Sequence, residues 1–171
     1  MLVPVCAVPR ALLFKEFRLT VLEYRPPSSG DILSVAARMR DADVLEVAAA
    51  SGDSPLEALL KSCNDADAVF CIVLDGHPEG IFGVSYAGGL GATVWLLGTD
   101  ALANIPRLMV TETRRITDDW RDRFSVLHNF VDDSNEVSKR WLAAVGFSFS
   151  EPVPYGPSQV PFRYFYKIGH V

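Results

Sequence analysis

Residues 133–147 read DSNEVSKRWLAAVGF, a segment with helix signals at both of its ends. Asn135 is suited to cap a helix, because its side-chain oxygen can accept a free backbone N–H of the first turn. Gly146 suits the other end, where the backbone commonly becomes left-handed. Between them Val137 and Trp141 lie four positions apart and therefore share one helix face. The segment predicts an amphipathic helix that packs on a sheet.

The rest of the chain alternates between strand and helix patterns. Ser54, Pro55 and Glu57 form a capping-box signature, which predicts the start of a helix. Runs rich in β-branched and aromatic residues, bounded by turn residues, predict strands. The expected strands lie at 18–26, 68–74, 81–87, 92–98, 125–131, 147–153 and 162–168. The expected helices are capped by Asp31, Asp41, Ser54 and Asn135, and a long one covers about 105–123.

This order of elements predicts an α/β fold whose mixed, mostly antiparallel sheet of six or seven strands is flanked by helices. Asp75 and Gly76 predict the turn of a hairpin between two of the central strands. The chain has 171 residues, a length typical of one domain. We therefore expect a single domain over 18–171, preceded by an apolar arm over 1–17.

The arm begins MLVPVCAVPRALLF. It lacks a basic start and is too short to cross a bilayer, so the sequence predicts neither a signal peptide nor membrane insertion. An apolar strip of this length packs either on its own domain or on another subunit. The residues expected to contact a partner are Leu2, Val3, Val5, Leu12, Leu13 and Phe14.

Charge and residue spacing exclude several classes of function. The formal net charge is −5, and no basic stripe offers the phosphate contacts on which nucleic-acid affinity depends. Cys6, Cys63 and Cys71 lack the spacing of metal ligands and are expected to be reduced packing residues. His128 is expected to pack on a sheet face rather than to act as a base. No metal and no nucleic-acid specificity are predicted.

The element order and the helix at 135–147 resemble the GNAT acyl-CoA N-acyltransferase fold over about residues 18–168. The last helix of that family resembles Asn-x-x-Ala-x-x-Leu-Tyr-x-x-x-Gly-Phe. This chain has Asn135, Ser138, Trp141, Leu142, Gly146 and Phe147 at those positions. If acetyl-CoA binds, the resemblance implies that Leu97, Gly98, Asn135 and Arg140 contact it.

Two departures from the family pattern bear on catalysis. The segment TDALANIPR after strand 92–98 lacks the loop glycines whose free amides bind diphosphate, and it places Asp100 near that position. Leu142 replaces the tyrosine that protonates the departing thiolate, and leucine can donate no proton. The departures predict an acetyltransferase-like fold that has lost CoA binding, with no cofactor and no catalytic residue assigned. Replacement hydroxyls could come from Tyr155, Tyr164 or Tyr166.

A second resemblance concerns WLLGTDAL, NFVDDSNEVSKRWLAAVGFSF and, upstream, DVLEVAAASGDSPLEALLKS. These segments are similar to the internal virion protein A family of short-tailed phages. The resemblance implies a virion-associated structural or morphogenesis protein, located in the virion and, during assembly, in the host cytoplasm. Its partners would be other phage virion proteins in a symmetric assembly.

The alternative is an active GNAT-type N-acetyltransferase that uses acetyl-CoA. An inhibitor of host defence is a third, lower-ranked hypothesis. An open split between strands 92–98 and 125–131 would favour the enzyme. A split filled by Trp95, Trp141 or Leu142 would favour an assembly protein.

Overall fold

The computed structural model describes residues 20–86, 88 and 91–169. The elements in chain order are β1 (Leu22–Arg25), α1 (Ser29–Ala37), α2 (Asp41–Ser51), α3 (Pro55–Asn64), β2 (Ala68–Leu74), β3 (His77–Tyr86), β4 (Ala92–Gly98), the 3₁₀ helix η1 (Asp100–Asn104), α4 (Pro106–Arg121), β5 (Val126–Asp132), α5 (Glu136–Val145), β6 (Ser148–Tyr155) and β7 (Val160–Ile168). The arm residues expected to contact a partner, Leu2, Val3, Val5, Leu12, Leu13 and Phe14, lie outside the described residues.

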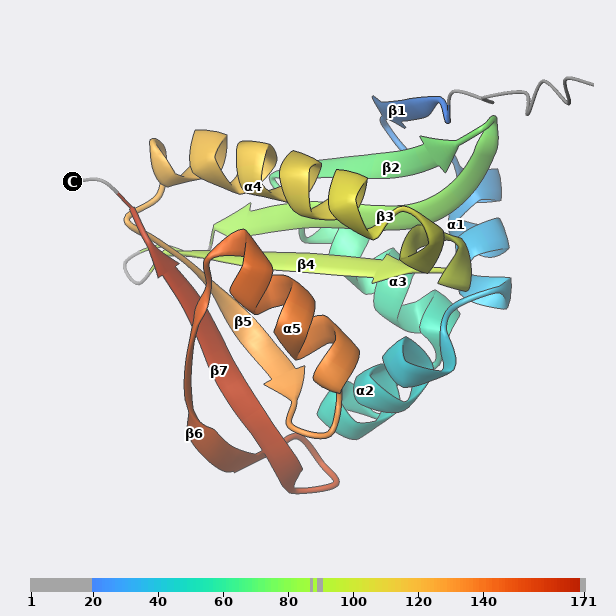
Figure 1. Ribbon diagram of the computed structural model, residues 1–171. Coiled ribbons are helices and arrows are strands. Elements are labelled where there is room, and N and C mark those ends of the chain that lie inside the picture. The colour runs from blue at the N-terminus through green and yellow to red at the C-terminus, as the bar shows by residue number, and fades with distance from the viewer. Residues whose placement is uncertain (1–19, 87, 89–90, 170–171) are drawn as a thin grey trace, which may run out of the picture.

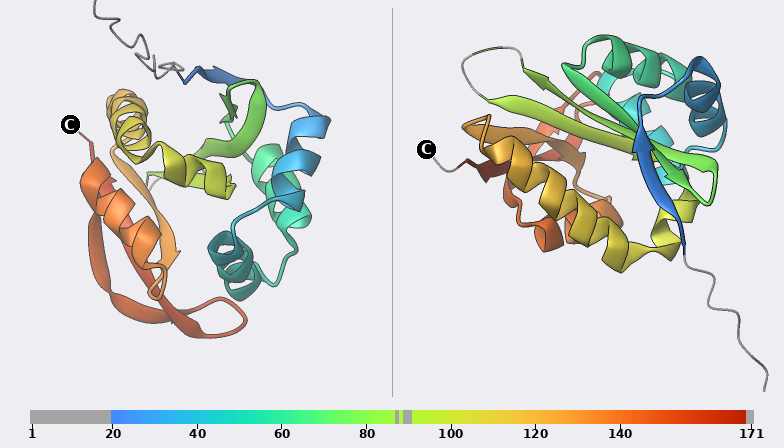
Figure 2. Two further views of the ribbon diagram at one scale, coloured as in Figure 1. Left: turned by 45° about the vertical axis from the view of Figure 1, so that its right-hand side comes forward. Right: turned by 90° about the horizontal axis from the view of Figure 1, so that it is seen from above.

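One sheet of seven strands organises the described part of the chain, in the order β1-β2-β3-β4-β5-β7-β6. Every neighbouring pair is antiparallel except β4 and β5, which run parallel. Helices α4 and α5 cover one face of the sheet, and α1 and α3 cover the other (Figures 1 and 2). The expected mixed, mostly antiparallel α/β architecture is confirmed.

The helix starts follow from local hydrogen bonds. Ser54 and Glu57 form the predicted capping box at α3. At α1 the expected cap was wrong. Ser28 is the cap, and Asp31 at the third helical position accepts a bond from the Ser28 N–H at 2.7 Å. Arg25 also donates to the Asp31 carboxylate, and this contact holds the pKa of Asp31 well below its usual range. Asp41 is the first residue of α2 rather than its cap.

The predicted hairpin turn at Asp75 and Gly76 is confirmed, with positive φ at both residues. The 3₁₀ helix after β4 was not predicted. It starts because the Thr99 hydroxyl accepts a bond from the Ala101 N–H. No helix in the described ranges is both long and apolar enough to span a membrane.

Candidate functional site

The two parallel strands in the middle of the sheet separate along their length. β4 and β5 pair only at Ala92 with Leu127 and at Thr93 with His128. One residue further on, the Asn129 side-chain amide bridges the gap and donates to the Val94 carbonyl at 3.0 Å. Since backbone groups of alternate strand residues face the same side, Leu96 directs its N–H and C=O into this split. The split therefore contains strand edge that β5 does not pair.

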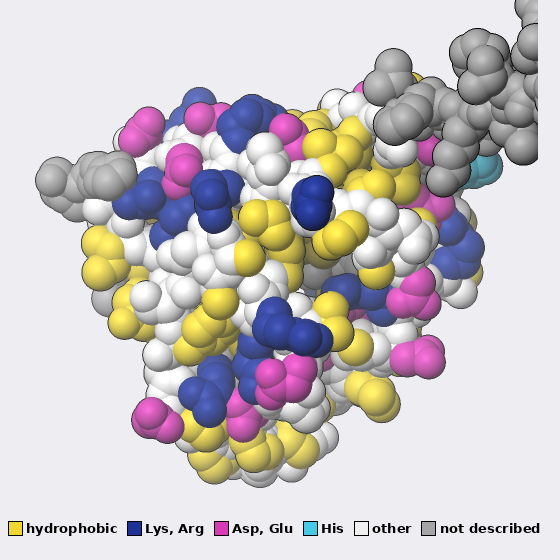
Figure 3. Space-filling model, in the orientation of Figure 1, with side chains coloured by type: hydrophobic (Ala, Val, Ile, Leu, Met, Phe, Trp, Pro, Cys, Tyr) yellow, Lys and Arg dark blue, Asp and Glu magenta, His cyan; other side chains and the backbone are white. Residues whose placement is uncertain are grey.

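A cavity of about 500 Å³ occupies the split. Its lining residues come from all seven strands, from α2, α3, α4 and α5, and from η1. Trp95, Trp141 and Leu142 line the cavity without filling it. Of the two arrangements weighed from the sequence, the structure has the open one. Lys and Arg side chains border the hollow between α4 and α5 (Figure 3).

Two tryptophans of the cavity wall have unsatisfied donors. The indole Nε1 atoms of Trp95 and Trp141 are buried and have no hydrogen-bond partner in the described part of the protein. Buried donors are nearly always paired, because leaving one unmade costs about 1–3 kcal/mol.

The N-terminus of α4 lies at the rim of the cavity, which Ala103 and Pro106 help to line. Ile105 precedes the helix and its side chain has no acceptor. The first intrahelical bond runs from the Met109 N–H to the Ile105 carbonyl. Pro106 has no N–H, so the amides of Arg107 and Leu108 remain as donors at the positive end of the helix dipole. Such an end suits an anion. Asp100 lies upstream, in η1, and is not part of the cavity wall.

Gly98, expected to contact the cofactor, instead closes the end of β4. Its N–H donates to Asp43 at 3.1 Å, and its carbonyl accepts from the Arg40 N–H at 3.0 Å. The Arg40 guanidinium in turn pairs with Asp43 at 2.6 Å. A side chain at Gly98 would also collide with Leu102, whose Cδ1 would lie 2.6 Å from an added Cβ. These contacts fix where the split ends.

Glu46 of α2 is the most unusual titratable group in the cavity. Its Oε2 accepts a hydrogen bond from the Asn135 side-chain amide at 2.9 Å. Burial, together with the neighbouring Asp43 carboxylate, raises the pKa of Glu46 from 4.5 to about 7. Among the described acids that line the cavity, Asp43 pairs with Arg40 and Asp53 with Lys61, whereas no ion pair is formed by Glu46.

The fold, with its split between the fourth and fifth strands, is similar to solved structures of acetyltransferases. No family model and no curated protein matches the sequence. Among solved structures, Ard1 from Thermoplasma volcanium aligns with a TM-score of 0.65 and 16% identity, covering 88% of this chain and 99% of that one. A GNAT acetyltransferase from Bacillus anthracis aligns at 0.63 and 14%, covering 86% and 94%. AAC(6')-Ib in complex with ribostamycin and coenzyme A aligns at 0.63 and 14%, covering 86% and 93%.

The chain has the GNAT acetyltransferase fold. At these identities the likeness concerns the fold alone. None of these three structures is a phage virion protein. The virion-associated role therefore stays a prediction.

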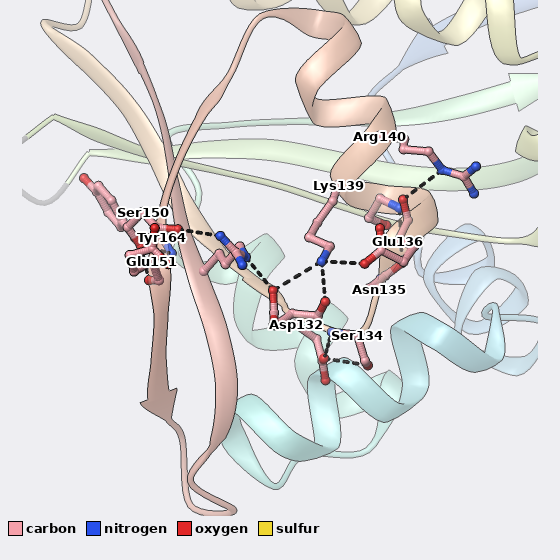
Figure 4. Close-up of polar contacts among 12 residues, drawn as sticks. Asp132, Ser134, Asn135, Glu136, Lys139, Arg140, Ser150, Glu151 and Tyr164 are labelled. Atoms are coloured by element: carbon pink, nitrogen blue, oxygen red, sulfur yellow. Dashed lines mark hydrogen bonds and ion pairs between the residues drawn. The ribbon is translucent and has the colours of Figure 1, made fainter.

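The residues expected to contact acetyl-CoA in this GNAT fold are partly brought together. Leu97 lines the cavity. Asn135 caps α5 through the Ser138 N–H and otherwise points to Glu46. Arg140 is exposed on α5, where its Nε donates to the Glu136 carbonyl at 3.2 Å (Figure 4).

The turn between β5 and α5 is held by an ion-pair network. Lys139 of α5 contacts Asp133 at 3.2 Å, and Arg163 of β7 contacts the same carboxylate (Figure 4). The network anchors the start of α5, and with it Asn135. The orientation of Glu46 therefore depends on three elements: α2, α5 and β7.

Of the tyrosines and the histidine considered from the sequence, Tyr155 alone lines the cavity. Tyr164 and Tyr166 lie outside its wall. The His128 ring packs against Tyr164 at 5.4 Å, and burial lowers the pKa of His128, which agrees with a packing role. Among the described residues, no group of three His, Cys, Asp or Glu side chains is placed to hold a metal ion.

Sequence reasoning missed Glu46. The available signal was a single carboxylate in the otherwise apolar run VLEVAAA of residues 44–50. A lone acid on the apolar side of a helix indicates either a buried partner or a functional group. Here the partner is an amide rather than a cation.

Proposed function

We propose that this protein is an N-acyltransferase that transfers an acyl group from an acyl-CoA thioester to a primary amine. The observation that carries the proposal is Glu46, a carboxylate without a cationic partner and with a pKa of about 7, in the cavity where a GNAT sheet splits. Solved structures that share the fold include an acetyltransferase with coenzyme A bound.

The groups around the split fit an acyl-CoA. β4 and β5 no longer pair at Leu96, so the backbone N–H and C=O of Leu96 can bond the amide groups of the acyl-CoA. The side chains of Trp95 and Trp141 line the cavity and offer it apolar surface. The N-terminus of α4, next to Pro106, suits phosphate. When bound, the donor supplies the electrophilic thioester carbonyl.

Glu46 is proposed to accept a proton from the ammonium form of the amine. A general base works best when its pKa lies near the working pH, and about 7 meets that condition. The freed nitrogen then forms the C–N bond while the C–S bond breaks and the thiolate leaves. As the amide forms, the nitrogen releases its second proton, which balances the proton that the thiolate takes up to become the CoA thiol. Asn135 acts as a positioning residue, because its amide holds the Glu46 carboxylate.

Leu142 lines the cavity but cannot protonate the thiolate. Tyr24 and Tyr155 are the tyrosines in the described cavity wall. Burial raises the pKa of Tyr24 to about 12, which makes it a weaker acid than an ordinary tyrosine. We assign proton donation to Tyr155.

Acetylation assays with acetyl-CoA and a panel of primary amines, read by mass spectrometry, test the proposal. Wild type should form the amide, and Glu46→Gln should reduce kcat by roughly 10²–10⁴-fold. Glu23→Gln, the same change at an exposed position of β1 outside the cavity, is the matched control. Absence of product with every amine, or equal rates for wild type and Glu46→Gln, would refute it.

We also propose, from the resemblance to internal virion proteins, a second role as a virion-associated component. The exposed Leu45 and Val137 side chains, at 69% and 57% exposure, border a surface hollow between α2 and α5 that suits a protein contact. Mass spectrometry of purified particles should detect the chain. Its absence, with unchanged particle yield after deletion of the gene, would refute this role.

A further inference from the structure

The outer strands of the sheet are covered differently on their two faces. Cys71 and Val73 of β2 point to the side of α1 and α3, and both are buried. Since alternate residues point to the other side, the pairing of β1 with β2 directs Leu22, Tyr24 and Phe70 toward α4. These three side chains are only partly buried. Helix α4 therefore leaves apolar surface open at this edge of the sheet.

The open surface forms a groove between β1 and α4. Tyr24 on one side, and Ile116 and Trp120 on the other, line the cavity of the split. The rings of Tyr24, Phe70 and Trp120 all pack on the buried Phe82, with centroids 5.7 Å, 5.4 Å and 6.1 Å away. We call the partly exposed residues of this cluster the β1–α4 groove: Leu22, Tyr24, Phe70, Ile116 and Trp120. Figure 3 shows hydrophobic side chains at the surface between α4 and β1.

The β1–α4 groove is one end of the cavity that contains Glu46. Tyr24 and Glu46 line the same cavity from different strands and helices. Burial and the Glu112 carboxylate of α4 raise the pKa of Tyr24 to about 12, which agrees with a tyrosine hydroxyl close to α4. A segment that covers the groove therefore closes this end of the cavity.

The chain that precedes β1 starts beside the groove. Val21 is 62% exposed, and both its N–H and its carbonyl bond to Asp75 at 2.9 Å, which fixes the chain one residue before Leu22. Residues 12–19 read LLFKEFRL, in which five of eight residues are large and apolar.

The length of this chain suffices to cover the groove. The 19 residues before Thr20 can span up to about 65 Å when extended. Helix α4 has 16 residues and is therefore about 24 Å long. The preceding chain can turn back at Thr20 and still follow the whole groove.

We infer that residues 12–19 of this chain dock in its own β1–α4 groove through their leucine and phenylalanine side chains. An apolar groove and an apolar segment each cost free energy when they face water, and docking buries both. The segment is covalently joined next to Leu22, so its effective concentration at its own groove exceeds that of a second copy in dilute solution. The inference does not depend on the proposed acyl transfer.

Photo-crosslinking of the full chain tests where the segment lies. Phe14→p-benzoylphenylalanine, irradiated at two protein concentrations and analysed by peptide mass spectrometry, should link within one chain to β1, β2 or α4. The yield should not depend on concentration. The same photoreactive residue at Val153, exposed on β6 at the opposite edge of the sheet, should give no link to these elements.

Two results of this experiment would overturn the inference. Links between two chains that increase with concentration would assign the groove to the segment of a second copy. Links to other elements only, or no links, would mean that the segment does not dock in the groove.

Hydrogen–deuterium exchange provides a second measurement without a photoreactive group. In a full chain with Leu12→Asp, Leu13→Asp and Phe14→Asp, β1 should exchange at least about tenfold faster than in wild type, because the apolar contacts of three side chains are lost. β5, in the middle of the sheet, should keep its rate. Leu45→Asp, an apolar-to-charged change on the exposed side of α2, is the control and should leave β1 unchanged. Equal exchange of β1 in wild type and in the triple variant would overturn the inference.

Discussion

Replacing Glu46 by glutamine should stabilise the protein relative to wild type, and this gain should grow as the pH rises. The pKa of Glu46 rises from 4.5 to about 7 on folding because burial disfavours its charged form. At about 1.36 kcal/mol per pKa unit, ionised Glu46 costs the folded state about 3 kcal/mol. Since the pKa of Glu46 is higher in the folded than in the unfolded state, this destabilisation is absent below the unfolded pKa and reaches its full size above pH 7.

Glutamine cannot ionise, and its amide oxygen still accepts the bond from Asn135. The Glu46→Gln variant should therefore gain about 1 kcal/mol over wild type near pH 5 and about 3 kcal/mol near pH 8.5. Urea unfolding at the two pH values measures this directly. Glu23→Gln, at an exposed position, should show no such slope. A gain independent of pH, or a loss at pH 8.5, would refute the argument that Glu46 is buried without a cation.

Two further substitutions test the packing around the site. Lys167 is only 7% exposed and donates to the Thr117 hydroxyl at 3.0 Å, to Asp118 at 2.8 Å and to the Val145 carbonyl at 3.2 Å. Lys167→Met should therefore lower the free energy of unfolding by about 2 kcal/mol, measured by urea denaturation, and an unchanged value would contradict these contacts. Gly98→Ala should cost about 1–3 kcal/mol, because its methyl group would press on Leu102. Thermal unfolding in a double-mutant cycle should show that Gly98→Ala costs less stability in a Leu102→Ala background than in wild type, and an equal cost in both would mean that the clash is not the cause.

The elements that the sequence predicted well are those with local signals. The helix at 133–147 has its cap, its apolar spacing and its final glycine within one stretch, and the structure places α5 there. The start of α3 was equally clear because Ser54 and Glu57 satisfy each other. Such contacts span few residues, so the sequence alone is enough to predict them.

The candidate site was harder to predict because its properties arise from contacts between distant segments. Glu46 becomes a candidate base only when α2 packs beside Asn135, far along the chain. The position of Asp100 depends on η1, which forms when Thr99 bonds back to Ala101. The strand pattern at 125–131 did predict His128 on one sheet face, but which face α5 covers depends on packing between distant segments.

We expect the split between β4 and β5 to bind an acyl-CoA, and calorimetric titration of the full chain with acetyl-CoA measures this binding. The titration should show saturable binding of one molecule per chain, with a Kd of about 1 μM to 1 mM, the range in which the KM values of enzymes usually lie. Tryptophan fluorescence should change in the same titration, because Trp95 and Trp141 line the cavity. No heat and no fluorescence change up to millimolar acetyl-CoA would contradict the claim.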